Sequence, residues 1–135
     1  MLSARKATVA AVISADPSQS GFESYIRSFE GNPYLKGIRY SLGDGNEPIP
    51  AHVLTNMKLL GKLGFSMDMN LSTDKLMKGV RVLDQCPGVK FILNHCGNAD
   101  PVAFFPADRI SPRKPEHDPE EWYRKMELLA QRSNL

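Results

Sequence analysis

The sequence lacks the short motifs that identify an enzyme's chemistry on their own. It has no glycine-rich phosphate loop, no His-x-His pair, no Cys-x-x-Cys and no Gly-x-Ser-x-Gly. These absences remove the usual signals for a nucleotide site, a paired-cysteine site and a serine nucleophile. Candidate functional residues must therefore come from the positions of single polar side chains.

Long apolar runs, charge blocks and paired cysteines are missing as well. The longest apolar run, Thr8 to Ser14, is far shorter than the ~20 residues that cross a bilayer, so we expect no membrane association. The net charge of +2 is spread over interleaved acids and bases, which argues against nucleic acid as a partner. Cys86 and Cys96 have no metal-ligand spacing and favour a reducing compartment. We therefore expect a soluble, cytoplasmic protein. The segment before Asp16 has no acidic residue and resembles a mitochondrial transit peptide, so a mitochondrial location is the alternative.

The residues that are present suit one globular domain. The chain has 135 residues, of which 41% are hydrophobic and 24% charged. Both fractions are ordinary for a soluble fold, and this length supports one core.

Four short apolar segments alternate with helical patterns. Strands are predicted to start near residues 7, 35, 65 and 89, at intervals of 28, 30 and 24 residues. Helices are predicted from 22 to about 29, from 51 to 62, from a cap at Ser72 or Thr73 to 85, and after the cap Asp118. Such alternation indicates an α/β fold with parallel strands. About four βα units fit either a small doubly wound sheet or half of a (β/α)8 barrel.

The segment 97–118 is predicted to be an extended loop. It bears apolar residues that need packing partners: Val102, Phe104, Phe105 and Ile110.

Polar residues stand where each predicted strand ends, and parallel α/β folds place their reactive groups there. They are Asp16, Arg39, Asp68, Asn70, Asn94 and His95. His95 lies at the end of the fourth strand, just before the turn at Cys96-Gly97. Such a histidine can ligate a metal or transfer a proton, and it can equally be satisfied by a backbone carbonyl.

Arg39 can bind a substrate carboxylate through two parallel hydrogen bonds, with an ordinary ion pair to Asp44 or Glu47 as the alternative. Asp68 should point away from the faces of Met67 and Met69, and Asn70 should share its face.

Three further residues are assigned structural roles. Cys96 is predicted to pack, because adjacent residues of a strand point opposite ways and would separate its thiol from the His95 imidazole. His52 and His117 are predicted to be solvated surface residues.

Four segments resemble the amidohydrolase-related family, in the branch that includes lactonases. Phe91 to Pro101, FILNHCGNADP, resembles its strand and turn "LDHCG...P". Residues 34–40, YLKGIRY, are similar to its "GVR" strand, and residues 65–70 are similar to its "FDL" strand. Residues 122–134 resemble the helix that precedes its "NVxxK" strand. The resemblance covers nearly the whole chain.

The resemblance implies a partial (β/α)8 TIM barrel, with residues 1–135 spanning central βα units and lacking the first and last strands. Family members open lactones or amides with an activated water, some using a divalent metal such as zinc. His95 would be catalytic and would contact the metal or the substrate, and Arg39 would bind substrate. By position, Asp68, Asn70 and Asn94 are also assigned to substrate binding.

The sequence departs from the family at three places. The family's first strand carries His-x-His, whereas the first histidine here is His52; its last strand carries a water-activating aspartate, and the chain ends before that strand. Asn94 stands where the family commonly has Asp. We therefore expect a small-molecule hydrolase fragment that is inactive alone and binds metal weakly. The alternative is a non-catalytic binding domain that pairs, as a homodimer or with a partner, through exposed strand edges.

Overall fold

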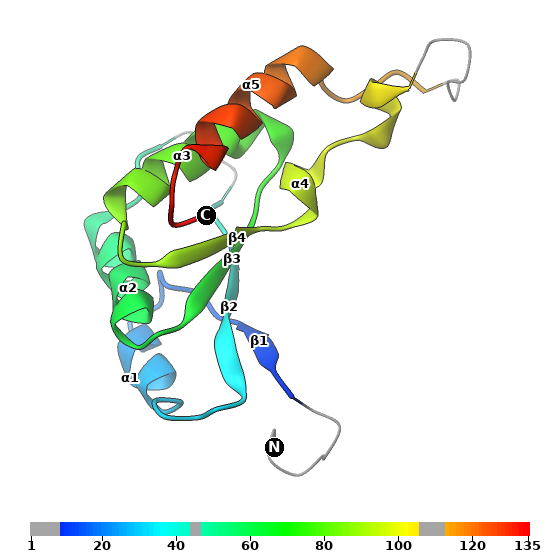
Figure 1. Cartoon of the computed structure of the whole chain (residues 1–135). Coiled ribbons are helices and arrows are strands. Elements are labelled where there is room, and N and C mark those ends of the chain that lie inside the picture. Colours follow the sequence, from blue (N-terminus) through cyan, green and yellow to red (C-terminus); the bar gives the residue numbers. More distant parts are fainter. Residues whose placement is uncertain (1–8, 44–46, 106–112) are drawn as a thin grey trace.

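The computed structural model describes residues 9–43, 47–105 and 113–135. Four strands alternate with helices along the chain, which confirms the predicted α/β fold (Figure 1). The elements are β1 (Ala11–Ser14), α1 (Phe22–Arg27), β2 (Leu35–Ser41), α2 (Ala51–Lys62), β3 (Ser66–Asn70), the short 3-10 turn η2 (Thr73–Lys75), α3 (Leu76–Gln85), β4 (Lys90–Leu93), α4 (His95–Asn98), η3 (Pro101–Phe104) and α5 (Pro119–Ala130).

All four strands pair in parallel, in the order β1-β2-β3-β4. Every crossover therefore moves the chain one strand onward in the same direction, and right-handed crossovers of this kind place all helices on one side. Figure 1 shows α1, α2, α3 and α5 following one another along the outside of the strands. A doubly wound sheet would reverse direction and carry helices on both faces. The winding is that of a barrel wall.

Alternate residues of the strands form two unlike faces. The covered face, beneath the helices, carries the row Ile13, Ile38, Met67 and Phe91. The open face carries the row Ser14, Arg39, Asp68 and Ile92 and the row Val12, Gly37, Ser66 and Lys90. Because side chains alternate along a strand, these two faces point in opposite directions.

The covered face and the apolar stripes of the helices form the core. The apolar residues that recur at helical spacing are buried on two helices: Val53, Met57 and Leu60 on α2, and Leu76, Val80 and Leu83 on α3. On α5, Leu129 is buried, whereas Trp122 and Met126 are half-buried. The helical spacing in the sequence thus identified the helix faces that pack on the sheet.

The segment 97–118 differs from the predicted loop in one respect. It contains the helical turns α4 and η3, and Phe104 and Phe105 remain exposed, at 37% and 57%. Phe104 packs against Trp122 and Tyr123 of α5 and not into the core, because α4 carries the chain past the end of the sheet. Ile110 lies outside the described residues, as do residues 7 and 8 of the predicted first strand.

The two edges of the sheet are not equivalent. On β4, the Phe91 N–H points away from β3 and donates to the Asn134 carbonyl at 2.7 Å. On β1, Ala11 and Ala15 donate to the β2 side, so Val12 and Ser14 direct their backbone groups outward. Judged by the described residues, β1 is the edge with more unpaired backbone groups.

None of the described helices combines the length and the apolar character that crossing a bilayer requires.

Candidate functional site

The carboxyl ends of β2 and β3 bring Arg39 and Asp68 together. The two residues are register partners on the open face, and Arg39 Nη2 lies 3.3 Å from Asp68 Oδ2. The Asp68 side chain is 7% exposed and that of Arg39 is 54% exposed. Asp68 Oδ1 is buried and has no hydrogen-bond partner among the described residues. A buried carboxylate thus orients a guanidinium whose remaining donors face solvent.

The alternative prediction for Arg39 was an ion pair with Asp44 or Glu47. Its described ion pair goes across the sheet to Asp68, because parallel register places these two residues side by side. Asp44 lies outside the described residues, and Glu47 is exposed in the loop that leads to α2.

A second acid lies next to Arg39 at the ends of β1 and β2. Asp16 and Tyr40 line, with Arg39, a hollow of about 370 Å³. Although burial opposes it, hydrogen bonds from Gln19, Ser18 and Tyr40 lower the pKa of Asp16. Burial and the nearby Asp16 carboxylate raise the pKa of Tyr40. Tyr40 was not singled out from the sequence, because a strand tyrosine is more often a packing residue.

Asn70 and Asn94 do not join the Arg39–Asp68 pair. Asn70 Oδ1 accepts a hydrogen bond from Asn98 Nδ2 at 3.0 Å, and the same amide donates to the Leu71 carbonyl at 2.8 Å. The Asn94 backbone N–H donates to Met69 O, which extends the β3–β4 ladder. The structure assigns both residues a structural contact, and their binding of substrate stays a prediction.

His95 begins a left-handed turn. His95, Cys96, Gly97 and Asn98 have φ of 51°, 51°, 71° and 50°. Left-handed backbone costs a residue other than glycine about 1–2 kcal/mol, so an unbroken run of it requires support. At Gly97 the reason for glycine is also steric, since a Cβ there would lie 2.5 Å from Leu76 Cδ2.

Three contacts hold this turn in place. Asn98 is fixed to the end of β3 by its amide, Gly97 N–H donates to Asn94 O at 2.9 Å, and Trp122 Nε1 donates to Cys96 O at 3.0 Å. The turn leaves the His95 side chain exposed at the carboxyl end of β4, beside a hollow. His95 thus follows the end of β4 and begins the turn, as expected, and it lines the hollow; its catalytic role stays a prediction.

The packing role predicted for Cys96 is wrong. Cys96 is exposed, and it lines the same hollow of about 500 Å³ as His95. The expected opposition of the two side chains assumed strand geometry, whereas both residues lie in the left-handed turn. Cys86 is the thiol that packs, and burial raises its pKa.

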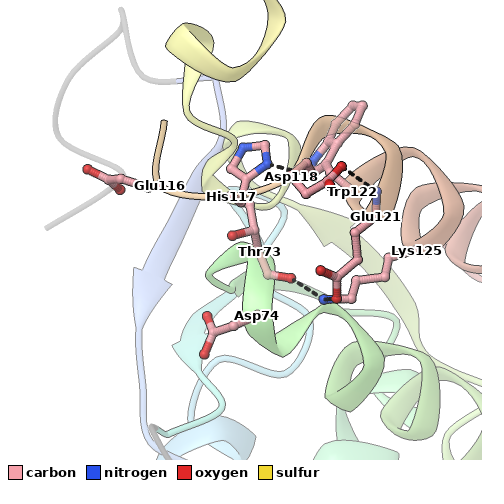
Figure 2. A pocket seen from close by; sticks show the side chains of 8 residues that line it. All are labelled: Thr73, Asp74, Glu116, His117, Asp118, Glu121, Trp122 and Lys125. Carbon is pink, nitrogen blue, oxygen red and sulfur yellow. Dashed lines mark hydrogen bonds and ion pairs between the residues drawn. The ribbon is translucent and has the colours of Figure 1, made fainter. Parts of the chain in front are cut away.

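A separate polar pocket lies between η2 and the start of α5 (Figure 2). It has a volume of about 160 Å³ and is lined by Thr73, Asp74, Glu116, His117, Asp118, Glu121, Trp122 and Lys125. Lys125 occupies its floor, pairing with Glu121 at 2.7 Å and donating to Thr73 O at 3.2 Å. These internal contacts connect η2 to the first turns of α5 and give the pocket a structural role.

His117 was predicted to be solvated, and this is wrong. Its side chain is half-buried, and Nε2 accepts a hydrogen bond from the Asp100 N–H at 2.9 Å. A ring nitrogen that accepts a hydrogen bond carries no proton of its own, so the imidazole proton of His117 lies on Nδ1. Nδ1 therefore donates to Asp118 O at 3.2 Å. His52 is exposed, as predicted.

Asp100 is a buried acid that sequence reasoning missed. Arg113 Nη2 lies 2.7 Å from its Oδ1, and the Glu116 and Val102 N–H groups donate to the same carboxylate. The Arg113 hydrogen bond lowers the pKa of Asp100 to about 2, with backbone hydrogen bonds adding to the effect against the cost of burial. Its position before Pro101, as the cap of η3, was the available signal.

The described side chains do not form a metal centre. Within residues 9–43, 47–105 and 113–135, no three His, Cys, Asp or Glu side chains lie close enough to hold an ion. The metal role assigned to His95 stays a prediction, and the donor set that a catalytic zinc requires is not found in this part of the chain.

Comparisons with known proteins identify a family and, separately, a fold. A family model described as amidohydrolase matches residues 1–135. Among solved structures, a crystal structure of an amidohydrolase from Burkholderia multivorans with bound zinc superposes with a TM-score of 0.71 at 17% sequence identity. The match covers 93% of this chain and 42% of that one. No curated protein matched.

The structural match also settles the choice between the two predicted architectures. The sequential sheet with helices on one side is part of a TIM barrel of the amidohydrolase kind. With a family model that spans every residue and the same fold in a solved amidohydrolase, the chain belongs to the amidohydrolase family.

Proposed function

We propose that this chain is the part of a hydrolase barrel that binds the substrate and transfers a proton. The hydrolase opens carboxylate-bearing lactones or amides with an activated water. The observation that carries the proposal is the Arg39–Asp68 pair at the carboxyl ends of β2 and β3. Parallel α/β barrels bind their substrates at this rim.

Arg39 is suited to hold the substrate carboxylate. Asp68 engages Nη2, and no other described side chain engages the guanidinium, which is more than half exposed. A planar guanidinium fixed on one side can present its other N–H donors as a fork that matches a carboxylate. Asp68 itself is buried, so its proposed role is to hold the guanidinium in place and not to contact the substrate.

His95 is suited to transfer a proton at the scissile bond. Its imidazole is exposed on the same rim, and histidine changes charge in the neutral pH range. Among the described residues no group hydrogen-bonds to the ring, whereas a working general base is normally oriented by a second group. We therefore propose that the 135-residue chain alone does not turn over these substrates.

Carboxylate binding tests the role of Arg39. Succinate, titrated into 15N-labelled protein, should shift the Arg39 Nε–H resonance saturably. Arg39→Met should weaken binding about tenfold or more, and Arg39→Lys should restore part of it because it keeps the charge and loses the fork. Arg27→Met is the matched control, since Arg27 is an exposed arginine on α1 paired with Glu23 and Glu30. Equal binding by wild type and Arg39→Met would refute the proposal.

Hydrolysis is tested separately with γ-lactones and N-acyl amides. We expect no turnover above the buffer rate. Turnover that disappears in His95→Ala would contradict the proposed inactivity and would support the proposed role of His95.

A second candidate function is pairing through a strand edge. The outward backbone groups of Val12 and Ser14 on β1 favour it, and Val12 is 41% exposed. On β4 the Phe91 N–H already donates to the Asn134 carbonyl, so that edge is the weaker candidate. A dimer in sedimentation velocity that Val12→Pro dissociates would favour this function, because proline cannot donate to a new ladder. A monomer at all concentrations would exclude it for self-pairing.

A further inference from the structure

The hollow beside His95 has aromatic walls. Phe104 of η3 and Trp122 and Tyr123 of α5 surround it, with Pro101 and Ala99 beside them and His95 and Cys96 of α4 at its border. This set of residues is called the aromatic hollow below. Among the residues that the structure describes, no Asp, Glu, Lys or Arg side chain lines it, so its chemistry suits a neutral, apolar group.

The three rings meet edge to face. The centroid distances are 5.0 Å for Phe104–Trp122, 5.7 Å for Phe104–Tyr123 and 5.0 Å for Trp122–Tyr123, at interplanar angles of 76°, 80° and 71°. In such a T-shaped contact the edge of one ring meets the face of the other, which is one of the arrangements that aromatic pairs prefer. Tyr123 is 51% exposed and Phe104 is 37% exposed, so much aromatic surface has no packing partner among the described residues.

The walls are held rigidly. Trp122 Nε1 donates to Cys96 O, which joins α5 to the left-handed turn that carries His95. Asp118 caps α5 by accepting from the Glu120 and Glu121 N–H groups, which fixes the first turn from which Trp122 and Tyr123 project. A wall held in this way loses little conformational entropy when a ligand binds.

The aromatic hollow is open to solvent and is large enough to receive one ring of a small molecule. Its volume of about 500 Å³ lies within the roughly 300–1,000 Å³ of typical ligand sites, whereas the polar pocket of Figure 2 has about 160 Å³. Ligand sites are mostly apolar with few polar groups, and here those groups are the His95 imidazole and the Cys96 thiol.

We propose that the aromatic hollow binds a neutral aromatic ring of the substrate, which places an aryl-linked carbonyl beside His95. The inference rests on the proposed role of His95 and narrows the substrate class to aryl amides or aryl lactones. The ring binds by edge-to-face contacts with Phe104, Trp122 and Tyr123, and the His95 side of the hollow receives the polar end of the ligand.

Two reporters built into the chain allow occupancy to be measured without turnover. Trp122 is the single tryptophan of the sequence, so its fluorescence reports on the hollow directly. Of the two thiols, Cys96 is exposed at the hollow and Cys86 is buried, so a thiol reagent labels Cys96 first. A ligand in the hollow should change the first signal and slow the second reaction.

Benzamide is the probe, and acetamide is its control without a ring. We expect benzamide to change Trp122 emission saturably and to slow the labelling of Cys96 severalfold, and acetamide to do neither at equal concentration. Tyr123→Leu and Phe104→Leu keep apolar volume and remove a ring. Each should raise the dissociation constant of benzamide about three- to tenfold, the fold-change that one aromatic pair corresponds to.

Tyr25→Leu is the matched control, because Tyr25 is 47% exposed and contacts Phe29 on α1, away from the hollow. It should leave benzamide binding unchanged. The same weakening in Tyr25→Leu as in Tyr123→Leu would overturn the proposal, as would no saturable signal with benzamide.

The outcomes separate this inference from the proposed function. Benzamide binding without succinate binding at Arg39 would keep the aromatic site and reject the carboxylate role. Succinate binding without benzamide binding would reject the aromatic site alone. The Trp122 emission of the protein without ligand is the last readout. If this emission changes with protein concentration and Tyr123→Leu abolishes the change, the hollow binds a protein partner and the small-molecule proposal is overturned.

Discussion

The covered and open faces of the sheet are made by the same strands, and they differ in what their residues do. On the covered face, Ile38 and Met67 have no exposed surface and pack beneath the helices. On the open face, their chain neighbours Arg39 and Asp68 form an ion pair and Ile92 is 48% exposed. The covered face therefore accounts for stability, and the open face and its carboxyl rim are available for binding.

The largest expected effect tests the covered face. Met67→Ala removes a fully buried side chain from the centre of its row and should destabilise the fold by about 2–5 kcal/mol. Ile92→Ala, on the adjoining strand of the open face, should cost below about 1 kcal/mol because half of that side chain is already in water. Urea denaturation measures both values. A loss for Ile92→Ala equal to that for Met67→Ala would mean that the open face is covered in solution.

A second experiment compares the strained rim with an ordinary turn. Gly97→Ala adds a Cβ that meets Leu76 and keeps φ at 71°, whereas Gly31 has φ of 76° and nothing within 4 Å of the added atom. Gly31→Ala should therefore cost only the left-handed strain, about 1–2 kcal/mol, and Gly97→Ala about 1–3 kcal/mol more through overpacking.

Thermal denaturation of both glycine variants provides the comparison. Equal losses would show that Leu76 can move aside, and that the left-handed turn is held by its hydrogen bonds alone. Labelling of Cys96 in Gly97→Ala gives a second measurement, because a displaced turn would change the exposure of this thiol.

The elements of the fold were largely predictable from the sequence, because apolar periodicity reports directly on burial. The stripe Val53, Met57 and Leu60 located α2, and the Asp118-Pro119 cap located α5. Periodicity did not choose between a barrel wall and a doubly wound sheet, since both have the same alternation of elements. Strand order decides that question, and it depends on long-range pairing.

The candidate site was predictable in its positions and much less so in its contacts. Polar residues after each strand located Arg39, Asp68 and His95 at the rim, because parallel strands share one carboxyl edge. The orientation of Cys96 could not be foreseen, since a left-handed turn of His and Cys opposes local backbone preference and depends on contacts from α5 and β3. Asp100 was missed because Arg113 and Glu116 are distant in the sequence.

A smaller effect is expected from breaking the ion pair of the open face. Arg39→Met leaves the buried Asp68 carboxylate without its cation and should cost about 1–3 kcal/mol. Arg27→Met, which breaks exposed pairs on α1, should cost below about 0.5 kcal/mol. The double variant Arg39→Met, Asp68→Leu should recover most of the loss, because no buried charge remains. Failure to recover would indicate that Asp68 is needed for the strand geometry itself.

The smallest effect is expected at acidic pH and concerns Asp100, the carboxylate that caps η3 and pairs with Arg113. Arg113 lowers the pKa of Asp100 to about 2, below its usual 3.8. A carboxyl whose pKa is lower in the folded than in the unfolded state stabilises the fold above the unfolded pKa, and this contribution is lost as the pH falls toward the folded pKa. The melting temperature of wild type should therefore exceed that of Asp100→Asn at pH 6, and this difference should close between about pH 4 and pH 2.

Asp84 is the control. Arg132 also lowers the pKa of Asp84, but its side chain is 52% exposed, so Asp84→Asn should give a smaller difference in melting temperature at pH 6. A gap for Asp100→Asn that stays constant down to pH 2 would mean that its backbone hydrogen bonds, and not its charge, hold η3 against the start of α5.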